Sequence, residues 1–260
     1  MSVQVEQYYT DSFLRNFIYF IRVNEEIICI DPFDAKCVKD YLGDEITKLK
    51  VLINTHEHPD HIGGNEELKN ELGLEIWAHK NGKGKIPGVT KFLEHGEKIK
   101  LDEEHYIEVL DTPGHTFAHL CFVLYKNNKA ECIFTGDTLF NAGVGHCKLG
   151  GDPEVLFETV CNQLKGLPED IKIYPGHEYL LNNLKFTLDR EEDNEKAKNL
   201  INEYEVQGDG VGFISDLALE KKINTFLRCD SPSIRKKLSL EEGSSDKQVF
   251  LKLRELRNRW

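Results

Sequence analysis

Three histidines and two acidic residues fall within seven residues directly after a short apolar run, and this segment constrains the fold most. The apolar run is Val51-Leu52-Ile53, and the polar segment is Thr55-His56-Glu57-His58-Pro59-Asp60-His61. Branched and large aliphatic residues in a short run bounded by polar residues predict a buried strand that ends in a loop. Loops at strand ends often carry chemistry. We therefore expect a functional site at the carboxyl end of this strand.

The composition is that of a globular protein and excludes several classes of function. A chain of 260 residues with 40% apolar residues can bury one large domain, or one domain and a smaller second one. The net charge of -12 argues against a nucleic-acid partner, which needs a basic surface. The apolar stretches are all shorter than the ~18 residues of a membrane span, so no membrane association is expected.

The cysteines and the first residues indicate a cytoplasmic protein. The seven cysteines stand singly along the chain without a CxxC pair, so a disulfide framework is not expected. The chain starts without a basic segment followed by an apolar run, so no signal peptide is expected. No sequence pattern demands a dimer, and we expect a monomer.

Apolar periodicity predicts alternating strands and helices up to about residue 178. Strands are expected at 17–23 and 27–30, forming a hairpin, and at 51–53, 74–78, 106–110, 119–124, 131–135 and 171–174. Helices are expected at 35–42, 65–72 and 153–164. Such alternation, with some hairpins, indicates an α/β fold with a mixed sheet.

The pattern changes after about residue 178, where only helical periods remain. Helices are expected at 182–190, 194–205, 215–227, 231–238 and 246–260, with Ser215 and Ser231 as N-caps. We place a boundary near 175–180. The prediction is a metal-binding catalytic domain over 1–177 and a helical substrate-binding domain over 178–260.

Three further strand ends carry the same kinds of side chain as the histidine-rich segment. His115, Asp137 and His177 each follow an apolar run and a glycine, which lets the backbone turn sharply and approach a centre closely. Imidazole and carboxylate ligands suit zinc, iron or manganese, and the absence of cysteine fits a catalytic site. Without an ion, burying so many imidazoles would leave polar groups without partners.

The seven candidate ligands divide naturally between two ions. The predicted sets are His56, His58 and His115 on one ion, and Asp60, His61 and His177 on the other, with Asp137 bridging. Two ions roughly 3.5–4 Å apart can share a hydroxide that acts as a nucleophile. Asp31 and His119 are either structural or contact a ligand. Structural roles are expected for the other histidines of the strands, His79, His95 and His105.

The motifs, in this order and spacing, resemble the metallo-β-lactamase superfamily over residues 13–180. Later motifs, including Gly176-His177-Glu178-Tyr179 and the C-terminal Arg-Glu-Leu-Arg-Asn-Arg-Trp, resemble the glyoxalase II family of hydroxyacylglutathione hydrolases. The resemblance implies a four-layer αββα sandwich with a C-terminal helical domain. It also implies two divalent metal ions, expected to be zinc, with iron or manganese as alternatives.

The activity that the resemblance implies is hydrolysis of a glutathione thioester, typically S-D-lactoylglutathione, to a 2-hydroxy acid and glutathione, as in methylglyoxal detoxification. Asp60 and Asp137 would orient the metal-bound hydroxide that attacks the thioester carbonyl. The ion held by the first set of histidines would stabilise the oxyanion. A thiolate is a good leaving group near neutral pH, so no dedicated general acid is required.

The last predicted helix offers a place for the carboxylates of glutathione. It has an apolar stripe formed by Val249, Leu253, Leu256 and Trp260. Arg254 and Arg257, three residues apart, share an adjacent face and match the basic pair that the family uses for the glycyl carboxylate. Tyr179 matches a tyrosine that contacts the peptide part of the substrate, and Asn183 is a further candidate.

The loop 145–151 departs from the family pattern. His146 stands where the family has a basic residue, and Lys148 stands where it has a tyrosine. Either Lys148 holds the same carboxylate from a shifted position, or the thiol carrier differs from glutathione. Cys147 is expected to be structural, since a metal-bound hydroxide already fills the role of nucleophile.

Two other functions remain as alternatives. A sulfur dioxygenase of the same fold would use one iron and glutathione persulfide, but it generally lacks a long helical C-terminal domain. A non-catalytic metal- or thiol-binding module would be favoured by an incomplete ligand set, whereas the set here is complete. A secreted β-lactamase is disfavoured by the missing signal peptide.

Overall fold

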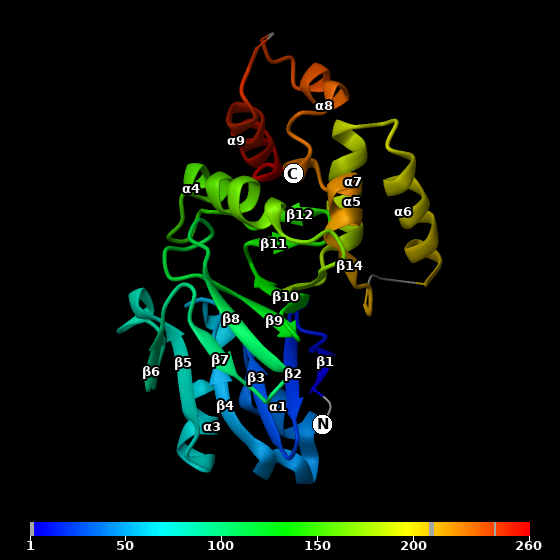
Figure 1. Cartoon of the computed structure of the whole chain (residues 1–260). Helices are drawn as coiled ribbons and strands as arrows, with labels where there is room; N and C mark the ends of the chain where they lie inside the picture. The colour runs from blue at the N-terminus through cyan, green and yellow to red at the C-terminus, as the bar shows by residue number, and fades with distance from the viewer. Residues whose placement is uncertain (1–2, 208–210, 242) are drawn as a thin grey trace.

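The computed structural model describes residues 3–207, 211–241 and 243–260 (Figure 1). Residues 1–2 of the first predicted domain and residues 208–210 and 242 of the second lie outside these ranges. None of the helices within the described ranges has the length and the apolar character needed to cross a membrane.

Two six-stranded sheets form the centre of the molecule. The first has the order β1-β2-β3-β4-β5-β6, and its strands are β1 (Val3–Tyr9), β2 (Phe17–Val23), β3 (Glu26–Ile30), β4 (Leu49–Ile53), β5 (Glu75–His79) and β6 (Lys91–Leu93). The second has the order β14-β13-β10-β9-β8-β7, and its strands are β7 (Lys98–Lys100), β8 (His105–Asp111), β9 (Leu120–Lys126), β10 (Lys129–Gly136), β13 (Lys172–Pro175) and β14 (Ser215–Asp216). Both sheets mix parallel and antiparallel pairs, as predicted.

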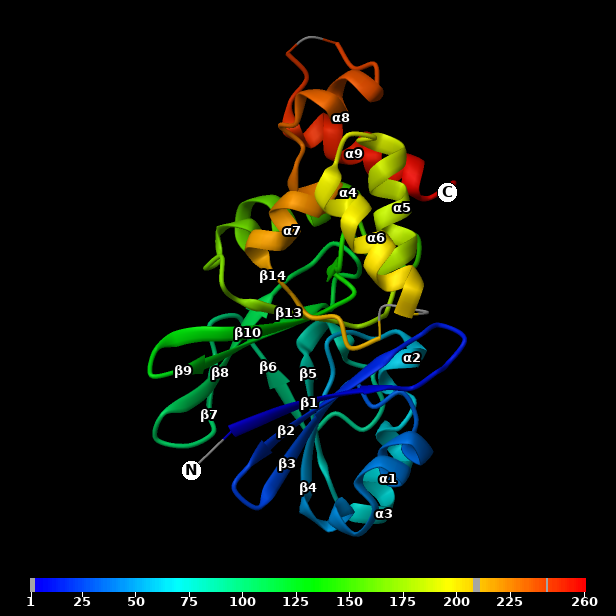
Figure 2. The ribbon, with the colours of Figure 1, turned by 90° about the vertical axis from the view of Figure 1, so that its right-hand side faces the viewer.

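Helices cover the outer face of each sheet. Apolar side chains such as Ile21, Phe122 and Phe134 are buried between the two sheets. On the far side of the first sheet lie α1 (Ala35–Leu42) and α3 (Asn65–Leu72), and on the far side of the second lie α4 (Pro153–Phe157) and α9 (Asp246–Arg257) (Figure 2). The predicted four-layer αββα sandwich is therefore confirmed.

The strands and helices predicted before residue 178 are present with small shifts of their ends, except in one helix. The helix expected at 153–164 is α-helical only to Phe157, after which it continues as a π-helical stretch (Glu158–Gln163) and a 3-10 turn (Leu164–Gly166). The strands and the α-helix that were missed before residue 178 are β1, β6, β7, the helical turn α2 (Pro59–Ile62) and the small hairpin of β11 (Leu139–Phe140) and β12 (Gly143–Val144). All but β1 span two to four residues, which is too short for periodicity to reveal.

The C-terminal part is helical but not entirely so. It contains α5 (Leu180–Arg190), α6 (Glu195–Gln207), α7 (Leu217–Ile223), a 3-10 turn (Thr225–Leu227), α8 (Pro232–Lys237) and α9. Ser231 is the N-cap of α8, with Pro232 at the first position, as predicted. The last helix ends at Arg257 rather than 260, and Trp260 at the end of its apolar stripe remains half exposed.

The prediction of one helix over 215–227 that begins at a Ser215 cap is wrong. Ser215 pairs with Ile173 in strand β14, which adds an antiparallel edge to the second sheet. The N-cap is Asp216, whose carboxylate accepts a hydrogen bond from the Leu219 amide at 2.9 Å. Asn224 ends α7, and its side chain accepts from the Phe226 amide at 3.1 Å. Short polar side chains thus cap the backbone where periodicity alone predicted continuation.

Candidate metal centre

Four strands deliver their loops to one edge of the two sheets. Strand β4 leads to His56, His58 and the one-turn helix α2, which carries Asp60 and His61. The segments after β8, β10 and β13 supply the other candidate ligands, which are His115, Asp137 and His177. The seven side chains predicted from sequence are therefore brought together.

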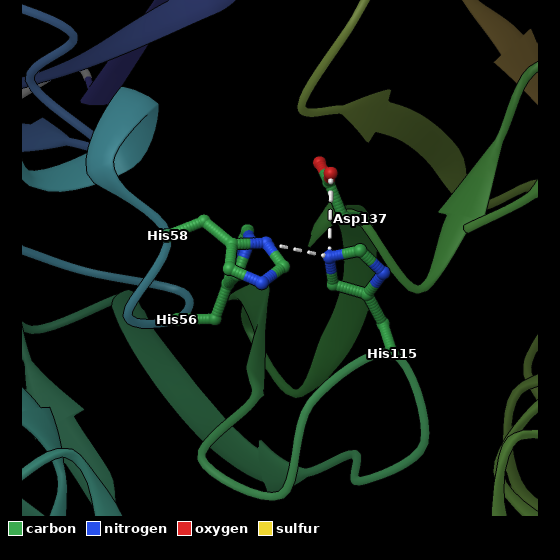
Figure 3. A group of neighbouring side chains, drawn as sticks. All are labelled: His56, His58, His115 and Asp137. Carbon is green, nitrogen blue, oxygen red and sulfur yellow. Dashed lines mark hydrogen bonds and ion pairs between the residues drawn. The ribbon is translucent and has the colours of Figure 1, made fainter. Parts of the chain in front are cut away.

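The first group consists of His56, His58, His115 and Asp137, and their ligand atoms all lie within 4.8 Å of one another. Figure 3 shows the three imidazoles and the carboxylate pointing toward a common space. His58 Nδ1 lies 3.0 Å from His56 Nε2 and 3.0 Å from His115 Nε2. Three imidazole nitrogen atoms and one carboxylate form a donor set that suits a transition-metal ion.

The second group consists of Asp60, His61 and His177, whose ligand atoms also lie within 4.8 Å of one another. Asp137 lies between the two groups. Its Oδ1 is 3.4 Å from His61 Nε2, and its Oδ2 is 3.2 Å from His177 Nε2 and 3.5 Å from His115 Nε2. A carboxylate in this place can serve both groups at once.

The ring nitrogen of each histidine that points away from the centre contacts a protein oxygen atom. The pairs are His56 Nδ1 with Thr55 Oγ1 (3.0 Å), His58 Nε2 with Leu149 O (3.1 Å), His61 Nδ1 with Asp31 Oδ2 (2.8 Å), His115 Nδ1 with His146 O (2.6 Å) and His177 Nδ1 with Leu14 O (2.8 Å). Carbonyl and carboxylate oxygens only accept, and the Thr55 hydroxyl donates to Asp31 Oδ2. The outward nitrogens must therefore donate, so in a ring that carries a single proton the inward nitrogen is the unprotonated one.

The inward atoms fit divalent cations. Unprotonated nitrogen atoms that face one another at 3.0 Å repel unless a positive charge lies between them. Burial lowers the pKa of His115 to about 4, so this ring is neutral at neutral pH. Asp137 Oδ1 is buried and accepts no hydrogen bond within the described residues. The donor types, the tautomers and the unsatisfied oxygen atom together identify a site for divalent metal ions.

Two glycines allow the close approach that the sequence predicted. Gly136 has a φ of +45°, and a Cβ there would lie 2.6 Å from Thr55 Oγ1. A Cβ on Gly176 would lie 2.5 Å from Asp137 Oδ1. A side chain at either position would displace a residue of the centre, which explains why glycines precede Asp137 and His177.

The residues that orient the ligands were only partly predicted. Asp31 contacts His61 as described, and the buried His119 accepts a hydrogen bond from the Asp137 amide through Nε2 at 3.1 Å. Asn16, which was missed, donates from Nδ2 to Asp60 Oδ2 at 2.8 Å. No motif marks Asn16, and its only signal is a polar residue directly before a strand.

The three histidines expected to be structural make local contacts away from the centre. Nδ1 of His79 accepts from the Asn81 amide at 3.0 Å, and Nδ1 of His95 accepts from the Asp111 amide at 3.2 Å. His105 Nδ1 contacts the Asp102 carboxylate at 2.9 Å. These contacts account for the rings without a ligand.

Two adjoining cavities open at the centre. The larger, about 370 Å³, is lined by ligand side chains and by Leu14, Phe140, Leu149 and Tyr179. The smaller, about 160 Å³, lies beside α9 and is lined by Lys148, Asn183, Arg254 and Arg257, among others. Phe140, His146 and Tyr179 line both cavities. A single elongated molecule could therefore occupy both cavities.

The smaller cavity contains two arginines that lack a carboxylate partner. Six of the eight arginines form ion pairs, whereas Arg254 and Arg257 form none within the described residues. Arg254 is 4% exposed, and Arg257 Nη2 donates to Asn183 Oδ1 at 3.2 Å. Burial, followed by the nearby Arg257 charge, lowers the pKa of Arg254 to about 10, so it remains charged at neutral pH. Buried charge without a counter-charge favours binding of an anion.

In the atypical loop 145–151, His146, Cys147 and Lys148 differ in their environment and protonation. Burial lowers the pKa of His146, so its ring is neutral at neutral pH. Lys148 lines the smaller cavity, and its Nζ donates to Asn258 O at 3.1 Å. Burial raises the pKa of Cys147 to about 11, which leaves a protonated thiol of low nucleophilicity.

The comparisons with known proteins agree with this geometry. The family model described as the metallo-beta-lactamase superfamily matches residues 13–177, and the model described as the hydroxyacylglutathione hydrolase C-terminus matches residues 178–260. The chain is 45% identical to the hydroxyacylglutathione hydrolase of Nitrosococcus oceani, with 98% of this chain and 99% of the relative covered. It is 41% identical to the protein of that name from Polaromonas sp., with the same coverage.

Solved structures share the fold at lower sequence identity. ETHE1 from Myxococcus xanthus matches with a TM-score of 0.69 and 22% identity, covering 99% of this chain and 92% of that chain. The protein TTHA1623, whose structure is described as a di-iron-bound form, matches with a TM-score of 0.60 and 24% identity, covering 85% and 100% of the two chains. The chain therefore belongs to the hydroxyacylglutathione hydrolases of the metallo-beta-lactamase superfamily and is a metal-dependent thioester hydrolase.

Proposed function

We propose that this protein hydrolyses S-(2-hydroxyacyl)glutathione, with S-D-lactoylglutathione as the typical substrate, to a 2-hydroxy acid and glutathione. The observation that carries the proposal is a pair of arginines, without a carboxylate partner among the described residues, in a cavity that adjoins the metal centre. Glutathione ends in a carboxylate, and a thioester bound with that carboxylate beside the arginines can reach the larger cavity with its acyl end. The names of the relatives support the same substrate class.

Two divalent ions would be held by the seven side chains as divided above. His56, His58 and His115 would hold one ion, Asp60, His61 and His177 would hold the other, and Asp137 would bridge them. The nitrogen and oxygen donors favour zinc, with iron or manganese as alternatives. When bound, such ions polarise a carbonyl oxygen and lower the pKa of water to near neutrality.

The side chains of the protein would position the reactants. Asp60, held by Asn16, and Asp137, held by His119, would orient the attacking oxygen through their carboxylates. Arg254 and Arg257 would bind the glycyl carboxylate, with Lys148 as a further cation at the edge of the cavity. Tyr179 and the neutral ring of His146 line both cavities and would contact the peptide part of the substrate. The thiolate would leave without a dedicated acid because thiolates are only weakly basic.

The two parts of the chain would divide the work. Residues 1–177 would act as the metal-binding catalytic domain, and residues 178–260 as the helical domain that binds the thiol carrier. We further propose a cytoplasmic monomer. Free cysteines throughout the described residues and the name of a cytoplasmic relative from Arabidopsis thaliana, 34% identical, support the location.

The test is hydrolysis of S-D-lactoylglutathione by purified protein whose metal content is measured on the same sample. We expect release of one free thiol for each thioester consumed, with two ions bound per chain. If the metal-loaded protein left this substrate intact but cleaved the lactoyl thioester of another thiol, the glutathione assignment would be wrong. Oxygen uptake with glutathione persulfide, in place of thioester cleavage, would indicate the dioxygenase instead.

A further inference from the structure

Residues 144–149 contact both the arginine cavity and the metal centre through their backbone carbonyls. The carbonyl oxygens of Val144 and Gly145 accept hydrogen bonds from Arg254 Nη1, at 2.8 and 3.0 Å. Further along the same segment, His146 O contacts His115 Nδ1 and Leu149 O contacts His58 Nε2. One short segment therefore joins a buried guanidinium to two imidazoles of the first metal group.

The segment has little freedom to move. A Cβ on Gly145 would lie 1.9 Å from Asp137 O and 2.8 Å from His115 Nδ1, so the backbone here packs directly against the centre. Its outer part is tied to the end of α9, since Lys148 Nζ donates to Asn258 O. Because the segment is short and closely packed, a shift at the Arg254 end must move the carbonyls at the other end.

The geometry points to Arg254 as a positioning residue for the first metal group. By holding the carbonyls of Val144 and Gly145, its guanidinium sets the course of the segment whose later carbonyls fix the tautomer and orientation of His115 and His58. The inference rests on the proposed function for the identity of the ligands. It gives Arg254 a second role besides binding the carboxylate, whereas Arg257 donates to Asn183 and forms no hydrogen bond with this segment among the described residues.

Metal affinity separates this role from simple substrate binding. Loss of a contact that orients a metal ligand typically weakens metal binding by about 10–100-fold, and we expect about tenfold for Arg254→Met because its effect passes through the segment. The dissociation constants of both ions are measured by chelator competition on the full chain, without substrate. The spectrum of the cobalt-loaded protein should also change for one ion of the two.

The matched variants are on the same helix and in the same segment. Arg257→Met should leave both metal dissociation constants unchanged, and Arg254→Lys should recover part of the metal affinity because lysine keeps a donor. Lys148→Met cuts the exposed tie to Asn258 and should weaken one ion a few-fold, which keeps the test valid if Arg254→Met does not fold.

Two metal affinities equal to those of the wild type in folded Arg254→Met, or in Lys148→Met if the former does not fold, would overturn the inference. These measurements need no thioester. A protein that failed to cleave S-lactoylglutathione but lost affinity for one ion in Arg254→Met would contradict the proposed substrate and retain the positioning role.

Discussion

The metal centre and the arginine cavity share lining residues but differ in the charge that each of them lacks. In the metal centre, the outward nitrogen of every histidine meets an oxygen atom, while the inward nitrogens and Asp137 Oδ1 lack positive partners. In the arginine cavity, the two guanidinium groups donate to neutral oxygen atoms and lie over the rings of Phe226 and Phe186, and neither has a carboxylate partner among the described residues. One region therefore requires cations and the other requires an anion. A metal-dependent hydrolase of an anionic thioester satisfies both requirements.

The two regions also differ in how they are built. The metal centre is formed by loops that follow four strands, of which β4 belongs to the first sheet and β8, β10 and β13 belong to the second. The positions of its atoms are therefore fixed by strand pairing in both sheets. The arginine cavity depends on one turn of α9 and on the segment that Arg254 holds. A substitution of a candidate metal ligand should therefore remove function, whereas one of Arg257 in the cavity should adjust substrate binding.

The largest effect is expected from Asp137→Ala, because this carboxylate lies between the two metal groups. We expect kcat/KM to fall at least about a thousandfold, since several kcal/mol of transition-state stabilisation depend on the ions. Asp60→Ala and His61→Ala should have similar effects. Thioester hydrolysis and metal content are measured together, with Asp170→Ala, an exposed partner of Lys129, as the control. Full activity of Asp137→Ala would show that the bridging assignment is wrong.

The next largest effect concerns Glu220 of α7, which is fully buried against the turn between β11 and β12. Its Oε2 accepts from the Ala142 amide at 2.8 Å, in the turn between β11 and β12, and from Asn224 Nδ2 at 3.1 Å. Burial raises the pKa of Glu220 from 4.5 to about 7. Because the folded state holds the proton more tightly, this contribution to stability is full below pH 4.5 and is lost as the pH rises through 7.

The variant Glu220→Gln lacks the titrating carboxyl group. It therefore serves as the reference for the pH dependence of the free energy of unfolding. Between pH 4.5 and 8, the free energy of unfolding of the wild type should fall by about 3 kcal/mol relative to the variant. Urea unfolding of both proteins across this range provides the comparison. Parallel curves for the two proteins would mean that Glu220 does not titrate within the range.

A smaller effect is expected in the arginine cavity itself. Arg257→Ala should raise KM for S-lactoylglutathione by about 10–100-fold with little change in kcat, since a charge-assisted hydrogen bond contributes about 1.5–3 kcal/mol. Arg259→Ala is the matched control on the adjoining stretch, because Arg259 is exposed and paired with Glu255. A fall in kcat with unchanged KM would assign Arg257 to the chemical step instead.

The smallest effect is expected at the wall that the two cavities share. The ring of Tyr179 stacks on His177 at a centroid distance of 5.0 Å, so Tyr179→Phe should preserve the packing and remove only the hydroxyl. Burial raises the pKa of this hydroxyl, which therefore remains a donor. We expect KM to rise about 2–10-fold, which corresponds to the free energy that one neutral hydrogen bond contributes to binding. Tyr106→Phe, on the distant strand β8, provides the control.

The parts of the site that could be predicted from sequence are those that depend on residue type. Histidines and aspartates after apolar runs, with glycines beside them, gave the seven candidate ligands, and α/β alternation gave the sheets. The carbonyls of Leu14, His146 and Leu149 could not be predicted, because every residue has a carbonyl and only tertiary contacts select which one faces an imidazole. The charge of His146 could not be predicted from sequence either, because it depends on the burial of the ring, which lowers its pKa.

The same limit explains the errors in the C-terminal part. Leucine and alanine spacing over 215–227 favours one helix, yet Ser215 pairs with Ile173, a partner 42 positions earlier in the chain. Strand pairing between residues far apart in the chain overrides the local preference for a helix. It cannot be detected in the short stretch of sequence over which periodicity is judged. Asp216 and Asn224 were the available signals, since both are residue types that cap helices and turns.

The oxygen atoms that contact the outward nitrogens of the five histidines have a consequence for metal exchange. Their hydrogen bonds orient each ring and fix its tautomer independently of the ions, so little conformational entropy remains to be lost when an ion enters. Replacing one divalent ion with another therefore requires no refolding of the loops. We expect the metal found in the isolated protein to follow the supply of metals during growth, with the fold itself unchanged.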